Sequence, residues 1–109
     1  MIKRLTMWQA KAGVAPEQAL RRWRREHAEL VRAVPGLRGY VQDHCTRSPE
    51  GGGIPFTGLG EVWFEDFESA TAAMESPEWA AVIADAATFM DLDAVVAGWA
   101  HEYRIIEPT

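Results

Sequence analysis

The chain has 109 residues, of which 48 % are hydrophobic and 25 % charged, and its net charge is −5. This length predicts one domain spanning residues 1–109, and the composition excludes a disordered chain. The negative charge argues against binding nucleic acid, whose phosphates repel such a surface. A single cysteine, Cys45, excludes an internal disulfide. Because no leader-like or membrane-spanning apolar run is present, we expect a cytoplasmic protein that does not contact membranes.

The first half of the chain predicts a strand, a helix and a second strand. Residues 2–10 form the first strand, and Pro16 begins a helix that extends to about Val34, where Pro35-Gly36 ends it. The apolar stripe of this helix recurs at three- and four-residue spacing and comprises Leu20, Trp23, His27, Leu30, Val31 and Val34. Residues 38–46 then alternate as the second strand.

Four arginines fall on the opposite side of the predicted helix, namely Arg21, Arg22, Arg24 and Arg25. They could form an anion or partner site. The simpler interpretation is a solvated face, held by pairs with neighbouring glutamates such as Glu17–Arg21 and Arg25–Glu29. We therefore assign these arginines no function.

The second half of the chain predicts the same order of strand, helix and strand. Residues 48–55 are a glycine-rich loop without the Gly-Lys-Ser/Thr sequence of a phosphate-binding loop, so we predict a hairpin loop. A third strand follows over residues 57–64. Asp66 is a good N-cap for one short helix and Ser76-Pro77 begins another. A last strand is expected over residues 95–106.

The order strand, helix, strand, strand, helix, strand predicts an α+β protein with a ferredoxin-like βαββαβ fold and a four-stranded antiparallel sheet. The helices can cover only one face of this sheet, yet both faces carry apolar residues. Leu59 and Trp63 alternate with Val62 and Phe64, for example. A second copy would cover the remaining face, so we expect a homodimer of the dimeric α/β-barrel type.

Several segments resemble one family. Residues 23–30 carry Trp-x-x-x-His-x-x-Leu, which resembles the helix signature of the EthD family of dimeric α/β barrels. Residues 35–44 are similar to its second strand. Residues 58–64, Ser76 to Trp79, Asp85 and Phe89 are similar to its second half. The resemblance spans nearly the whole chain and implies the same ferredoxin-like fold, a homodimer and a pocket between helices and sheet.

The resemblance does not imply a single reaction. Proteins of the family and of similar barrels include isomerases of lactones, and decarboxylases, dehydratases and cyclases of polyketide products. Most of these need no metal or organic cofactor. The sequence itself has no paired ligand motif such as His-x-x-x-His, so we predict no metal and no cofactor.

His27 is the central candidate, because it lies within an apolar helical stripe and histidine changes charge near neutral pH. The alternative is a core histidine bonded to a backbone carbonyl. Tyr40 could donate to a substrate oxygen, or could simply pack on its strand. The candidate catalytic residues are His27, Tyr40, Asp85 and His101. The candidate substrate-binding residues are Trp23, Leu30, His44, Trp63, Val82 and Phe89.

Three functions follow from these residues. The first is a cofactor-independent enzyme, a cyclase, isomerase, dehydratase or decarboxylase, acting on a small aromatic, lactone or polyketide-like substrate. The second is a dimeric carrier or accessory protein for a hydrophobic metabolite. The third is a haem-handling monooxygenase of a similar barrel, in which a histidine would bind iron. In the first two the partner is a small hydrophobic organic molecule.

Overall fold

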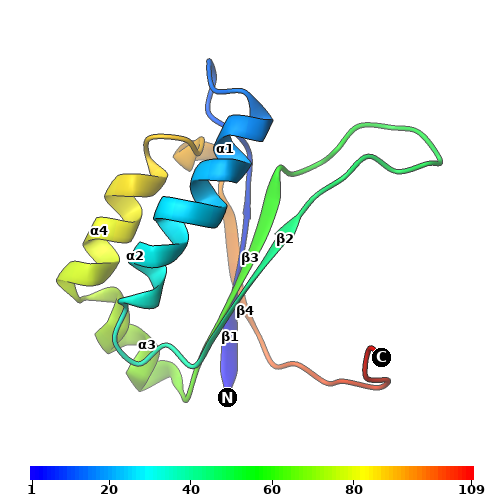
Figure 1. The fold of residues 1–109 in the computed structure, drawn as a ribbon. Coiled ribbons are helices and arrows are strands. Elements are labelled where there is room, and N and C mark those ends of the chain that lie inside the picture. Colours follow the sequence, from blue (N-terminus) through cyan, green and yellow to red (C-terminus); the bar gives the residue numbers. More distant parts are fainter.

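The computed structural model describes residues 1–109 and has the predicted α+β architecture, with four strands forming one antiparallel sheet (Figure 1). The strands are β1 (Ile2–Trp8), β2 (Gly39–His44), β3 (Gly58–Phe64) and β4 (Val96–Ala100). The helices are α1 (Pro16–Arg22), η1 (Trp23–His27), α2 (Ala28–Arg32), α3 (Phe67–Met74), α4 (Pro77–Ala86) and η2 (Leu92–Ala94). The ferredoxin-like fold expected from the sequence is therefore confirmed.

Two helix starts follow the capping chemistry of the sequence. The Asp66 carboxylate accepts a hydrogen bond from the Ser69 N–H at 2.8 Å and begins α3. The Ser76 hydroxyl accepts from the Trp79 N–H at 3.2 Å and begins α4, with Pro77 at the first helical position. Each cap satisfies an N–H that has no partner within the helix.

The strand order is β2-β3-β1-β4, and the register decides which side chains share a face. Arg4 pairs with Val62 of β3 and with Trp99 of β4, while Val62 pairs with Tyr40 of β2. Because side chains alternate across a sheet, these residues all face the helices. Trp63 faces the opposite side, which no helix covers (Figure 1).

The three consecutive helical segments of residues 16–32 form one continuous helix with a π turn over Trp23–His27. Its most buried residues are Ala19, Trp23, His27 and Val31, which are four residues apart at each step. In a regular α-helix of 3.6 residues per turn, each such step drifts by about 40°, so the four side chains would spread over about 120°. The wider π turn absorbs part of this drift and keeps Trp23 and His27 directed at the sheet.

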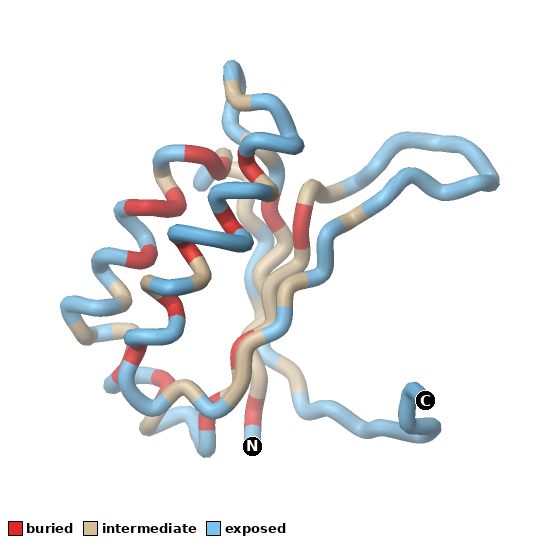
Figure 2. The backbone as a smooth tube through the Cα atoms, in the orientation of Figure 1, coloured by how far each residue is buried: buried red, intermediate tan, exposed pale blue.

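The core divides into two clusters at opposite ends of the β1–β3 pair. The aliphatic cluster comprises Ile2, Val31, Val34, Val62, Phe64, Ala70, Ala73 and Val82. The aromatic cluster comprises Trp8, Ala19, Trp23, Ala86, Phe89 and Met90. Ile2 pairs with Phe64 at the first end, and Trp8 pairs with Gly58 at the other. Buried residues therefore lie where helices and sheet face one another (Figure 2).

Two segments extend from this body, the β2–β3 hairpin loop and residues 101–109 (Figures 1 and 2). The last strand is shorter than predicted, because β4 ends at Ala100, which pairs with Lys3 near the start of β1. Because β1 begins at Ile2, which lies opposite residue 101 in this register, the chain from residue 102 onward runs past β1 and has no strand to pair with. None of the helices is long and apolar enough to cross a membrane.

Candidate functional site

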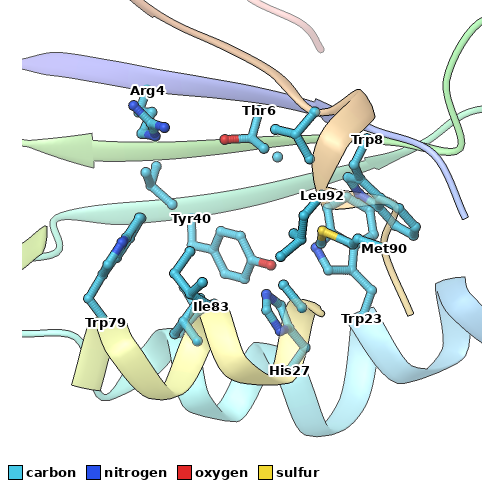
Figure 3. A pocket seen from close by; sticks show the side chains of 16 residues that line it. Arg4, Thr6, Trp8, Trp23, His27, Tyr40, Trp79, Ile83, Met90 and Leu92 are labelled. Atoms are coloured by element: carbon cyan, nitrogen blue, oxygen red, sulfur yellow. The ribbon is translucent and has the colours of Figure 1, made fainter. Parts of the chain in front are cut away.

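A cavity of about 130 Å³ lies between the helices and the covered face of the sheet (Figure 3). It is lined by residues from β1, β2, β3, the first helix and the α4–β4 region, namely Arg4, Thr6, Trp8, Trp23, His27, Val31, Tyr40, Gly60, Val62, Trp79, Val82, Ile83, Ala86, Met90, Leu92 and Val95. An apolar cavity of about 150 Å³ holds one benzene ring. The cavity therefore suits a one-ring ligand, which is smaller than the polyketide-like substrates considered from the sequence.

His27 is buried at the end of the π turn and is held by a carboxylate from α4. Its Nδ1 lies 2.9 Å from Asp85 Oδ2. The other Asp85 oxygen accepts hydrogen bonds from Arg22 Nε and Nη2. Burial raises the pKa of Asp85, but the bonds from Arg22 and His27 outweigh it and leave this pKa below its usual value. Asp85 is therefore ionised at neutral pH.

The ionised carboxylate fixes the proton position on His27. A carboxylate can only accept, so Nδ1 carries the proton and Nε2 keeps a lone pair. Nε2 has no hydrogen-bond partner within the chain, and the ring lines the cavity. Burial lowers the pKa of His27 more than its bond to Asp85 raises it. The ring is thus a neutral base directed into an apolar cavity.

Tyr40 reaches the same cavity from β2, and its hydroxyl points toward His27 (Figure 3). Gln42 Nε2 donates to the Tyr40 hydroxyl oxygen at 2.6 Å and to the Trp23 carbonyl at 2.8 Å. The Trp23 carbonyl can only accept, so it fixes the amide with its nitrogen on that side. Gln42 Oε1 therefore accepts from His44 Nε2 at 3.0 Å. Since its oxygen already accepts a bond, the Tyr40 hydroxyl has its proton left to donate.

The acidity of Tyr40 agrees with this donor role. Burial raises the pKa of Tyr40 to about 12, so the hydroxyl stays protonated at neutral pH. The cavity thus presents a hydrogen-bond donor, Tyr40, near a proton acceptor, His27 Nε2. This combination can stabilise charge on a ligand oxygen while a proton moves to or from a neighbouring atom.

Other residues predicted for the site lie in or behind the cavity wall. Trp23 and Val82 line it. Phe89 is buried behind it, with its ring in edge contact with His27 at a centroid distance of 5.2 Å. These residues hold the histidine ring between aromatic and aliphatic neighbours.

Four of the predicted residues lie elsewhere. His101 is exposed and follows the end of β4, and Trp63 lies on the uncovered face under the Lys3 ammonium, because β3 alternates. Leu30 packs on the aliphatic cluster instead of the cavity. His44 is exposed at the end of β2, where its ring stacks on Trp23 and bonds Gln42.

Two residues of the site, Arg22 and Arg4, were missed by sequence reasoning. Arg22, assigned to the solvated face, instead bonds Asp85, and neither the Glu17–Arg21 nor the Arg25–Glu29 pair forms. Gln42 lies on the Tyr40 face, as the alternation of β2 predicts, and positions Tyr40. Arg4 lines the cavity from β1. The alternation of the first strand, which places Arg4 on the same face as Ile2 and Trp8, was the available signal for that residue.

The three histidines do not converge, and no group of three His, Cys, Asp or Glu side chains is arranged to hold a metal ion. Sites for drug-sized ligands occupy roughly 300–1,000 Å³. The cavity beside His27, at about 130 Å³, is too small for a haem. Its size therefore disfavours the haem-handling alternative.

Known proteins of this fold match most of the chain. The EthD domain model matches residues 11–93. An ethyl tert-butyl ether d (EthD) family protein from Bacillus halodurans is 25 % identical, with a TM-score of 0.77 over 94 % of this chain and 100 % of that one. An EthD-like protein from Ralstonia eutropha is 21 % identical, with a TM-score of 0.73 over 99 % of this chain and 95 % of that one.

A third structure, a dimeric ferredoxin-like protein of unknown function from Thermobifida fusca, is 16 % identical. Its TM-score is 0.69 over 90 % of this chain and 87 % of that one. No curated protein matches the chain.

Proposed function

This chain belongs to the EthD domain family, and from that premise we propose that it is a cofactor-independent enzyme that moves a proton on a small organic ligand. His27 is the base and acid of the proposed reaction, and Tyr40 is the hydrogen-bond donor. The observation that carries the proposal is the 2.9 Å hydrogen bond that His27 Nδ1 donates to Asp85 Oδ2, which leaves Nε2 on the cavity side.

The simplest reaction of this kind is an isomerisation. His27 Nε2 takes a proton from a carbon beside a carbonyl group, and the Tyr40 hydroxyl donates to the carbonyl oxygen as negative charge develops there. Asp85 stabilises the imidazolium that forms. In a ligand with a carbon–carbon double bond β,γ to the carbonyl, His27 then returns the proton to the γ carbon as the double bond moves into conjugation with the carbonyl, so the reaction needs no oxidant, reductant or second substrate.

The proposal includes a homodimer that covers the open face of the sheet. This face carries Leu5, Met7, Val41, Leu59, Trp63 and Val96. The C-terminal segment adds three apolar side chains, Tyr103, Ile105 and Ile106, which are 83 %, 88 % and 87 % exposed. Apolar surface of this kind is usual where a second subunit binds. Light scattering should give about twice the chain mass of 12.2 kDa, and a stable monomer would contradict the dimer without affecting the cavity chemistry.

Solvent-proton exchange tests the chemistry without knowledge of the natural substrate. In deuterated buffer, the protein should exchange the protons beside the carbonyl of one-ring lactones and enones, observed by NMR. His27→Gln should slow the exchange by about 100-fold or more, the usual contribution of a positioned base. His101→Gln is the matched control, because His101 is exposed and lies outside the cavity.

The carrier alternative predicts a different outcome of the same experiment. A carrier would bind these compounds, and His27→Gln would weaken their binding, but the wild-type protein would cause no exchange above the buffer rate. Exchange that is equally fast in wild type and His27→Gln would also contradict the enzyme proposal.

A further inference from the structure

Arg4 differs from every other arginine of the chain. It is the only one that is not exposed, and its side chain lines the cavity. It forms no hydrogen bond or ion pair with any residue of the chain, whereas Arg22, Arg32, Arg38 and Arg104 each contact a carboxylate. The neighbouring Lys3, on the other face of β1, contacts Glu61 at 2.7 Å and Glu102 at 3.0 Å.

The residues around Arg4 partly exclude water from its guanidinium group, but none of them provides a carboxylate that pairs with it. Burial is the only cause that shifts the pKa of Arg4, and it lowers this pKa. The guanidinium carbon lies 5.3 Å from the centroid of the Trp99 ring, which offers a cation–π contact. A half-buried cation with only an aromatic neighbour keeps most of its hydrogen-bond donors free. An anion that enters the cavity and pairs with Arg4 can therefore offset the free-energy cost of burying the guanidinium group.

The position of Arg4 restricts the shape of such an anion. Arg4 and Trp79 lie at one end of the cavity, whereas the Tyr40 hydroxyl points away from them, toward His27 (Figure 3). The residues between, such as Val62 and Ile83, are apolar. A ligand that contacts both ends carries a negative group at one end and a polar group at the other, joined by an apolar part of about one ring.

We propose that Arg4 binds the carboxylate of a small one-ring organic acid whose opposite end meets Tyr40 and His27. The planar guanidinium suits a carboxylate, because it can donate two parallel hydrogen bonds. This inference rests on the proposed function for the location of the reacting end, and it adds the chemical class of the ligand.

Paired probes that differ only in charge test this proposal. Calorimetry with the full chain should show that 4-hydroxybenzoate binds about tenfold or more tightly than neutral 4-hydroxybenzamide, because hydrogen bonds between charged groups are the stronger ones. Arg4→Met should abolish this preference, and Arg4→Gln is a second neutral variant in case the first folds poorly. Arg4→Lys should retain part of the preference for the acid, because lysine keeps the positive charge but cannot donate the two parallel hydrogen bonds of the planar guanidinium. Arg21→Met, on the exposed face of α1, should leave it unchanged.

Three results would overturn the inference: equal affinity of wild type for acid and amide, no binding of either probe, or a preference that persists in Arg4→Met. Failure of the proposed function would give a different result. The wild-type protein would then cause no proton exchange above the buffer rate, but it would still bind the acid more tightly than the amide, because that preference is measured by binding alone.

Discussion

The two core clusters lie at opposite ends of one pair of strands and differ in chemistry. The eight residues of the aliphatic cluster around Ile2 and Phe64 include no titratable side chain, and Tyr40 packs against them from β2. The aromatic cluster around Trp8 and Trp23 borders His27, whose ring contacts Phe89. Aliphatic side chains fill space closely and exclude water, whereas rigid rings leave edges and gaps in which a polar group can be held. The cavity has walls from both clusters: Val62 and Val82 of the aliphatic cluster line it, as do Trp8 and Trp23 of the aromatic cluster. The comparison indicates that the site forms where the two clusters meet, with Tyr40 packed on one and His27 beside the other.

The largest loss of folding stability is expected from a substitution in the aliphatic cluster. Phe64→Ala should lower the free energy of unfolding by about 3–5 kcal/mol, the usual range for a fully buried phenylalanine, because Phe64 is 0 % exposed. Phe67→Ala is the matched control, since Phe67 is 54 % exposed, and it should cost less than about 1 kcal/mol. Urea unfolding measures both variants, and similar losses would contradict the assignment of stability to this cluster.

The aromatic cluster should be sensitive to added volume at Gly58. A Cβ there would lie 2.6 Å from Trp8 Nε1 and 2.7 Å from a Trp23 ring carbon, and both rings are buried. Gly58→Ala should therefore cost about 1–3 kcal/mol and weaken ligand binding. At Gly60 the nearest atom is 3.5 Å away, so Gly60→Ala should be close to neutral. If both variants unfold at the same urea concentration, the tight packing inferred around Gly58 is wrong.

The polar network between the clusters is tested by Asp85→Asn. This change removes the charge that holds Arg22 and fixes the proton on His27 Nδ1, and it should cost about 1–3 kcal/mol. NMR of labelled histidine should show the proton of His27 shifting in part to Nε2, with slower proton exchange. Asp93→Asn, at an exposed carboxylate, should change neither property. An unchanged His27 tautomer would mean that Asp85 does not position the base.

The smallest expected effect is a pH dependence of stability. His27 is buried among Arg22, Asp85 and Tyr40, and its pKa lies below the ordinary 6.5. Unfolding therefore takes up a proton below pH 6.5, so the contribution of neutral His27 is complete above that pH and is lost as the pH falls toward its folded pKa. The slope is at most about 1.4 kcal/mol per pH unit.

Urea unfolding at several pH values between 7.5 and 5 measures this slope, which His27→Gln should reduce. His44 is the necessary comparison, because burial also lowers its pKa. His44→Gln should remove a separate and smaller part, since His44 is exposed. A wild-type slope that is unchanged in His27→Gln would show that His27 is not the titrating group.

Local patterns in the sequence predicted much of the fold. The alternation of residues 38–46 placed Tyr40 and Gln42 on one face, and Asp66 and Ser76 marked two helix starts. The last strand was overestimated because His101, Tyr103 and Ile105 continue the alternation of β4. Alternation predicts which face of the sheet a side chain would occupy, but a strand also needs a neighbouring strand to pair with. Because β1 begins at Ile2, which lies opposite residue 101 in this register, β1 offers no partner to residues 102–106.

The candidate site could be predicted only in part, because its contacts join distant positions. Asp85 lies 58 residues from His27 and Arg22 lies 63 residues from Asp85. The sequence places each of them on a helix face, but only the packing of η1 and α2 against α4 brings the three together. Arg22 was assigned to solvent for this reason, since its partner is not at the i+3 or i+4 spacing that marks pairs within one helix.

The π turn has a consequence for how this domain can be shortened or redesigned. A π turn takes up one more residue than an α turn, so deleting one residue between Trp23 and His27 would restore a regular helix and leave the later residues close to their present direction. Redesigning residues 23–27 as a regular α-helix of unchanged length would instead turn His27, Val31 and Val34 about the helix axis relative to Trp23. An idealised scaffold of the same length would therefore lose both the direction of His27 toward Tyr40 and the core contacts of Val31 and Val34, whereas one that is shorter by one residue would keep both.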